Sequence, residues 1–280
     1  MSRRVDVIDD LSLRGLVACQ KLSDVTDAWL SELFSEAVSQ EKKAGDIVLI
    51  AVGGYGRREL APQSDLDVLL VHDSVKNIGD IASRLWYPIW DAGLKLGHAV
   101  RTPKETVKLC GTDLDTATSL VTARVIAGNQ DLGRKVIDEA TKSWQTKGRQ
   151  WLIELHGRVR ERHTQAGEVA FLLEPNVKEG LGGLRDMHTL HWAVKAGLDL
   201  LPGDEVELQH CNEVLLNVRV ALHRHAGKPV DVLRLEDQRS VAELAGYATD
   251  DALMAAIASV GRRVAWIADE VWARLDPPAH

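Results

Sequence analysis

The stretch GGYGRRELAPQSDLDVLLVHD, residues 53–73, decides the fold that we predict for this chain. The apolar run DIVLIAV (46–52) leads into it and the run LDVLLVH (66–72) closes it, and both patterns predict buried strands. Glycine has no Cβ, so the two glycines after the first run allow the backbone to approach a ligand closely. A helix beginning within GYGRREL would then direct its first amide groups at an anion such as a phosphate.

Asp65 and Asp67 stand two positions apart at the start of the second predicted strand. Side chains alternate between the two faces of a strand, so we expect both carboxylates on the same side. One or two carboxylates together with phosphate oxygens form the coordination that Mg²⁺ prefers. Such a metal positions an attacking oxygen and stabilises a leaving pyrophosphate. The sequence therefore predicts a magnesium site at these two residues, beside a cradle for a nucleotide triphosphate.

Either half of this stretch alone has a simpler interpretation. GGYG is typical of a turn, and DLD at the start of a strand is typical of two solvated acids. Both halves occur here in order, separated by one short segment. That combination favours the nucleotide site over the simpler interpretation.

The composition narrows the class of protein. The chain has 280 residues, of which 45% are hydrophobic, as is usual for globular domains with a core. Its net charge of -7 argues against a nucleic-acid binder, which usually has a basic face. No apolar run approaches the ~18 residues of a membrane span, and the charged start MSRRVDVIDD lacks the apolar region of a signal peptide. Because the three cysteines are also far apart, we expect a cytoplasmic protein with reduced thiols and no membrane partner.

The rest of the sequence predicts a small α/β region followed by helices. LKLGHAVR (94–101) is a third candidate strand, with a helical pattern before it. After residue 104 strand signals nearly vanish, and we expect helix even through TATSLVTARVIAG (116–128). Gly128 and Gly227 stand where C-terminal helix caps are expected.

These residues resemble the nucleotidyltransferase superfamily that includes DNA polymerase β, with its glycine pair, short helix and Asp-x-Asp strand. The fuller pattern GGYGRREL-x-P-x-SDLD is more similar to the bacterial PII uridylyltransferase/uridylyl-removing enzymes and, more loosely, to glutamine synthetase adenylyltransferase. A second block, EPNVKEGLGGLRD (174–186), resembles the P-N-x-K-x-G-x-G-G-L-R-D motif of the same family. The resemblance covers about residues 45–270.

The resemblance implies a fold class in two parts. It consists of an α/β nucleotidyltransferase domain, with a small mixed sheet and flanking helices, followed by a mostly α-helical domain. We place an N-terminal helical segment at 1–45, the nucleotidyltransferase domain at 46–140 and the helical domain at 141–280.

The resemblance also implies roles for individual residues. Asp65 and Asp67 would be the catalytic residues and the Mg²⁺ ligands, while Gly53 and Gly54 would let backbone amides reach the phosphates. An alternative for the second block is a plain helix start, with its arginine paired on the surface. Four further residues are expected to contact the nucleotide or to fix its loop: Arg57, Ser64, Lys178 and Arg185.

The reaction implied by the resemblance is transfer of UMP or AMP, from UTP or ATP, to a protein. The acceptor in the family is a tyrosine hydroxyl on the T-loop of the PII nitrogen-signalling protein, and pyrophosphate leaves. The sequence leaves open which base the donor carries. It also leaves open two alternatives, a nucleotidyltransferase that modifies another protein or a small-molecule hydroxyl, and a nucleotide-binding regulatory module without turnover.

The sequence departs from the family in two respects. The superfamily usually supplies a third carboxylate, and the corresponding position near Gly97 has no acid; Asp91, Asp113 and Asp186 remain open as substitutes. The family proteins continue into a nucleotide-removing HD domain and two glutamine-sensing ACT domains, which this sequence of 280 residues does not contain. We therefore expect no uridylyl-removing activity from this chain.

Overall fold

The structure is a computed structural model that describes residues 2–275, and these residues form two compact units. Unit 1 combines residues 2–7 with two longer segments, Gln20–Leu60 and Ser64–Thr146. Unit 2 combines residues 147–275 with two short segments of earlier sequence. These short segments are Ile8–Cys19 and Ala61–Gln63.

A four-stranded mixed sheet forms the centre of unit 1, in the order β3-β2-β1-β4. β1 (Ile47–Ala51) is antiparallel to β2 (Leu66–His72) and to β4 (Arg124–Gly128), whereas β3 (Leu96–Arg101) runs parallel to β2. Every residue of β1 is buried, as its uninterrupted apolar run predicts. The small mixed sheet of the predicted fold class is therefore confirmed.

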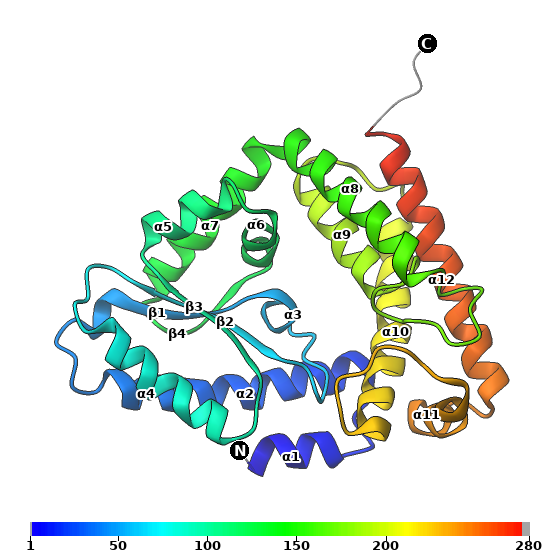
Figure 1. Cartoon of the computed structure of the whole chain (residues 1–280), viewed down its shortest axis with the longest axis horizontal. Helices are drawn as coiled ribbons and strands as arrows, with labels where there is room; N and C mark the ends of the chain where they lie inside the picture. The colour runs from blue at the N-terminus through cyan, green and yellow to red at the C-terminus, as the bar shows by residue number, and fades with distance from the viewer. Residues whose placement is uncertain (1, 276–280) are drawn as a thin grey trace. The chain divides into compact units, whose positions relative to one another are not determined.

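Helices cover both faces of this sheet (Figure 1). α4 packs on one face, where the ring of Trp86 lies 5.4 Å from that of His98 on β3. On the other face, Val48 and Leu69 of the sheet pack with Leu120 and Val136 of the helices. The helices of this part of the chain are α1 (Ser2–Asp9), α2 (Gly15–Val38), α3 (Gly53–Gly56), α4 (Ile78–Asp91), α5 (Pro103–Cys110), α6 (Leu114–Val121) and α7 (Gln130–Thr146).

The expectation of continuous helix over residues 116–128 is wrong. α6 ends at Val121, and residues 124–128 form β4 along the open edge of β1. Two β-branched residues favour the extended backbone there. Gly128 is not a helix cap but the last residue of β4, where its φ is 90° and a Cβ would lie 2.4 Å from the Ile47 carbonyl oxygen.

Unit 2 is helical and is built around α10 (Asp204–Ala226). Buried residues of this helix, such as Leu215 and Leu222, share one core with Val241 and Ile257. Gly227 caps α10 at a φ of 63°, as predicted. The other helices are α8 (Gly148–Ala166), α9 (Leu184–Lys195), α11 (Gln238–Ala245) and α12 (Asp250–Ala273).

The proposed boundaries at residues 45 and 140 stay a prediction, and residues 1 and 276–280 of the outer segments lie outside the described part. No helix within residues 2–275 combines the length and the apolar character that a membrane crossing requires.

Candidate active site

Asp67, the second residue of β2, lies between two glycines of unit 1. A Cβ at Gly53 would be 3.3 Å from Asp67 Oδ2, and one at Gly97, its partner in register on β3, would be 2.2 Å from Oδ1. Gly53 also has a φ of 59°, which residues with a side chain rarely adopt. The carboxylate therefore faces bare backbone on both sides, and a side chain at Gly97 would displace it.

This close approach gives a physical reason for the missing third acid. The position opposite Asp67 has no room for a side chain, so Gly97 cannot be replaced by an acid without moving β2 or the carboxylate. Of the three substitutes left open, Asp91 is exposed at the end of α4, and Asp113 caps α6 by accepting the amide of Thr116 at 2.8 Å. The third, Asp186, belongs to unit 2.

Asp65 is exposed and lies one residue before β2, whereas Asp67 is partly buried. Within residues 2–275, no group of three or more Asp, Glu, His or Cys side chains is arranged to hold a metal ion. The donor set nevertheless fits Mg²⁺, which takes one or two carboxylates and completes its coordination with phosphate oxygens and water. The cradle at Gly53 and Gly97, which a Cβ would fill, supports this fit.

Arg57 and Ser64 belong to the same unit as these carboxylates. The guanidinium of Arg57 pairs with Glu59 at 2.7 Å, and it lies 3.7 Å from where a Cβ on Gly54 would be. The hydroxyl oxygen of Ser64 is buried without a hydrogen-bond partner among residues 2–275. A buried hydroxyl without a partner is rare, so this atom is a candidate for a contact with a ligand or with water.

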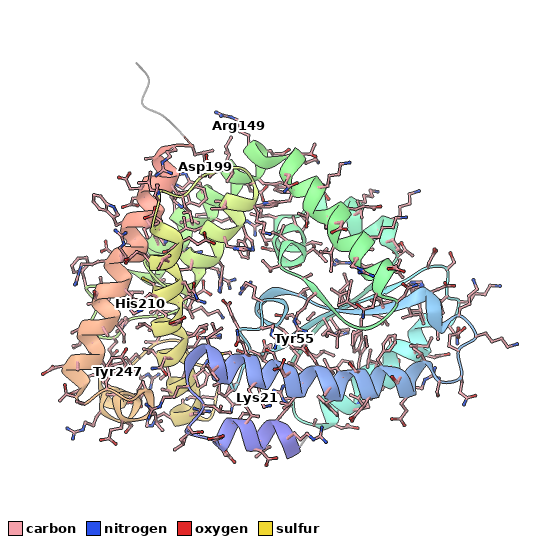
Figure 2. The ribbon with its side chains drawn as sticks, turned by 180° about the vertical axis from the view of Figure 1, so that it is seen from behind. Lys21, Tyr55, Arg149, Asp199, His210 and Tyr247 are labelled. Carbon is pink, nitrogen blue, oxygen red and sulfur yellow. The ribbon has the colours of Figure 1, made fainter. Side chains whose placement is uncertain are left out.

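The sequence did not reveal the side chains that hold α3 in place. Tyr55 donates its hydroxyl to Asp27 of α2, and Arg124 of β4 donates to the same carboxylate at 2.8 Å (Tyr55 is labelled in Figure 2). The Arg124 guanidinium also lies 4.9 Å above the Tyr55 ring, a cation–π contact. Burial, followed by the Asp27 charge, raises the pKa of Tyr55, so its hydroxyl remains a donor. Two elements, α2 and β4, thereby fix the turn that contains Gly53 and Gly54.

A hollow of about 250 Å³ extends from Gly53 and Asp67 along the sheet toward α6. Its wall on the helix side includes Asp115, Thr116 and Ser119. Asp115 was not among the predicted site residues, because only the folding of α6 over the sheet brings it beside the Asp-x-Asp strand.

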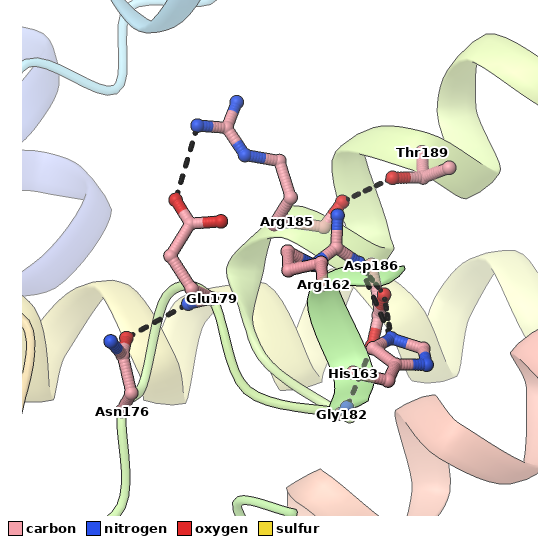
Figure 3. A network of polar contacts seen from close by, with 8 residues as sticks. All are labelled: Arg162, His163, Asn176, Glu179, Gly182, Arg185, Asp186 and Thr189. Atoms are coloured by element: carbon pink, nitrogen blue, oxygen red, sulfur yellow. Dashed lines mark hydrogen bonds and ion pairs between the residues drawn. The ribbon is translucent and has the colours of Figure 1, made fainter. Parts of the chain in front are cut away.

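Lys178 lies in the loop before α9 of unit 2, and Arg185, labelled in Figure 3, is the second residue of that helix. Arg185 pairs with Glu179 at 3.2 Å, and Lys178 lies 4.0 Å from the same carboxylate and 3.4 Å from Asp231. The Asn176 side chain holds the loop by accepting the amides of Lys178 and Glu179. The loop and the first turn of α9 therefore present two cations, each already paired with acidic neighbours.

Asp186, in the first turn of α9, fastens the start of this helix to α8, as Figure 3 also shows. Its carboxylate is 1% exposed and accepts hydrogen bonds from Arg162, from the Gly182 amide at 2.7 Å and from His163 at 2.8 Å. A carboxylate with this set of donors is a structural clamp, and it is a poor candidate for the missing metal ligand.

Two family models match this chain. Residues 31–122, which include β1, β2, β3 and Asp67, match the nucleotidyltransferase domain. Residues 152–272, which include Lys178 and Arg185, match the family described as GlnD PII-uridylyltransferase.

Curated relatives carry the name bifunctional uridylyltransferase/uridylyl-removing enzyme. The protein from Streptomyces coelicolor is 40% identical over 253 residues, which is 90% of this chain and 30% of the relative. The protein from Mycobacterium tuberculosis is 34% identical over 273 residues, or 94% of this chain and 32% of the relative. One from Pseudomonas entomophila is 35% identical over 72% of this chain and 24% of its own length. The chain thus spans about a third or less of these relatives, and over that span it belongs to the PII-uridylyltransferase family of nucleotidyltransferases.

Proposed function

We propose that this chain transfers UMP or AMP from UTP or ATP to a tyrosine of the PII signal protein. The single observation that carries the proposal is the Asp67 carboxylate, held between the bare backbones of Gly53 and Gly97. It lies within the region that matches the nucleotidyltransferase domain. The acceptor follows from the family match of residues 152–272, described as PII-uridylyltransferase, and the names of the relatives, which describe uridylyltransferases, support the reaction.

The transfer exchanges one phosphorus–oxygen bond for another. The tyrosine oxygen forms a bond to the α-phosphorus of the donor, and the bond from this phosphorus to the bridging oxygen of pyrophosphate breaks. Pyrophosphate leaves and the hydroxyl proton is released. The protein itself forms no covalent bond in this reaction. Its contribution is to position the two substrates and to stabilise the charge that develops on them.

Asp65 and Asp67 are the residues that would hold Mg²⁺, which, when bound, offsets the negative charge of the triphosphate and of the leaving pyrophosphate. Gly53 and Gly54 would admit the phosphates close to the backbone amides of α3. The Ser64 hydroxyl, buried without a partner among the described residues, would contact a phosphate oxygen or a water molecule. Arg57 would add positive charge next to Gly54.

In unit 2, Lys178 and Arg185 would contribute to binding of the donor through charge-assisted hydrogen bonds. Both side chains now pair with Glu179, so contact with a triphosphate requires them to exchange one acidic partner for another. The proposed function is transfer of the nucleotide to PII and does not include its removal. The expectation that this chain does not remove the nucleotide stays a prediction, tested by following release of nucleotide from modified PII.

The test is release of pyrophosphate by the chain with Mg²⁺, PII protein and either UTP or ATP. Comparison of the two donors identifies the base. We expect release that requires PII and is lost in Asp65→Asn and Asp67→Asn, whereas Asp80→Asn, at an exposed position on α4, retains it. Donor binding without release, with PII present, would instead support the nucleotide-binding module. Release with a different hydroxyl acceptor and not with PII would support the other nucleotidyltransferase.

A further inference from the structure

The hollow beside Asp67 has an apolar floor and a polar rim. Leu69 on β2 and Ala99 on β3 are partners in register on the same sheet face as Asp67, and both line it. Across from them stand Asp115 and Ser119 of α6. An apolar floor with a few polar groups is the usual composition of a ligand site.

The size of the hollow limits what can enter it. Sites for drug-sized ligands, a class that includes nucleoside triphosphates, occupy about 300–1,000 Å³. The volume of about 250 Å³ here is below this range and suits one aromatic side chain.

The charges of the hollow also select its occupant. Two carboxylates, Asp67 and Asp115, and one guanidinium, Arg101, line it. Because Asp67 would carry the metal of the proposed function, the charges that remain in the hollow, on Asp115 and Arg101, balance each other and offer no net attraction to the polyanionic end of a nucleotide. A neutral phenol fits instead, because its ring can lie on the apolar floor and its hydroxyl can meet polar groups at the rim.

The hollow can be reached from the edge of the sheet. β3 is the outermost strand, and its residues Gly97 and His98 are exposed. A protein loop that approaches along this edge would therefore reach the hollow without crossing another strand.

We propose that this hollow receives the side chain of the acceptor tyrosine, with its hydroxyl directed toward Asp67. The inference rests on the proposed function and adds where the acceptor binds. It also gives Gly97 a second role, because any side chain there would fill the mouth of the hollow in addition to moving Asp67.

The experiment blocks the hollow after the protein has folded. Ser119 is partly exposed, and the three native cysteines are buried, so Ser119→Cys gives one accessible thiol. Benzyl methanethiosulfonate would attach a benzyl group there through a disulfide, and dithiothreitol would remove it. The KM for PII and the Kd for the donor nucleotide with Mg²⁺ are measured before labelling, after labelling and after reduction.

We expect labelling to raise the KM for PII by about tenfold or more. This is the loss of affinity expected when one aromatic anchor is kept out of its pocket. The Kd for the donor should stay unchanged, and reduction should restore the KM. Ala99→Leu fills the hollow from the opposite wall and should act in the same direction. The control is a Lys104→Cys variant labelled in the same way, since Lys104 is exposed on α5.

Three results would overturn the proposal. A parallel loss of donor affinity would mean that the hollow holds the nucleotide, and an unchanged KM for PII would mean that no acceptor side chain enters it. Absence of transfer by the unlabelled, unmutated chain is the third result, and it would overturn the proposed function together with this inference. Transfer by the unlabelled chain together with an unchanged KM for PII after labelling would overturn this inference alone and leave the proposed function standing.

Discussion

Two regions of this molecule carry the motifs of its family, and they differ in what surrounds their carboxylates. Around Asp67 in unit 1, the backbones of two glycines approach the carboxylate closely, and a hollow opens beside it. In the loop before α9 of unit 2 and the first turn of that helix, the charged groups pair with one another, and the buried Asp186 is surrounded by donors. The first region has the properties of a place for chemistry, and the second those of an ordered support that presents two cations.

The largest expected effect is at Gly97. In Gly97→Ala the new Cβ displaces the Asp67 carboxylate. We expect the rate of transfer to PII to fall by about a hundredfold or more, because small displacements of a group that stabilises the transition state have effects of this size. The measurement is the turnover of the variant with its melting temperature. Gly79→Ala is the matched control, because Gly79 lies on α4 with nothing within 4 Å of the new Cβ. Equal turnover in the two variants would contradict the proposed position of the site.

Asp186→Ala should affect stability rather than chemistry. It leaves Arg162 partly buried without its carboxylate, and loss of one partner of a buried pair costs about 3–5 kcal/mol. We expect a decrease of about 3 kcal/mol in the free energy of unfolding by urea. Asp199→Ala, at an exposed position labelled in Figure 2, should change it little. A similar small decrease in both variants would mean that Asp186 is no clamp.

Arg185→Ala tests whether the loop contributes to donor binding. The side chain is 35% exposed and shares Glu179, so we expect a modest rise of about three- to tenfold in the KM for the donor nucleotide, with the fold intact. Circular dichroism checks the fold, and Arg149→Ala on the exposed side of α8 is the control. Unchanged kinetics would remove Arg185 from the site.

The smallest effect concerns pH. Burial lowers the pKa of His223, whose Nδ1 accepts the Gln63 amide. Although burial acts to raise it, the contact with His223 and the charges of Arg219 and Lys178 hold the pKa of Asp231 well below its usual range. Both groups bind protons more readily in the unfolded chain, so stability should fall as the pH falls below about 6.5 for the histidine and below about 4 for the aspartate.

Urea unfolding at pH 7, 6 and 5 measures the histidine part of this dependence. In His223→Asn the amide oxygen can replace Nδ1 as the acceptor without titrating, and we expect its stability to vary less over this range. The same slope in both proteins would show that His223 does not account for the loss of stability in acid.

The sequence predicted the elements whose cause is local. The apolar runs DIVLIAV and LDVLLVH predicted β1 and β2, and LKLGHAVR, the third candidate strand, forms β3. β4 was not predicted, because Arg124–Gly128 has a helical sequence pattern. It becomes a strand through its pairing with β1, which is distant in sequence.

The same distinction holds for the site. Gly53, Gly54, Asp65 and Asp67 lie within one short stretch, residues 53–67, and the motif could therefore be read directly. The Tyr55–Asp27–Arg124 cluster and the position of Asp115 depend on side chains from separate elements, which only the folded chain brings together. The lack of a third acid at Gly97 was visible in the sequence, whereas its steric cause was not.

The most direct test of the central claim is the intact mass of PII after incubation with this chain, Mg²⁺ and UTP or ATP. We predict that PII gains the mass of one nucleoside monophosphate on a tyrosine, and that the gain disappears in Asp67→Asn. A gain that persists in this variant, or no gain from a folded chain that binds the donor, would contradict the assignment of the Asp67 cradle as the centre of transfer.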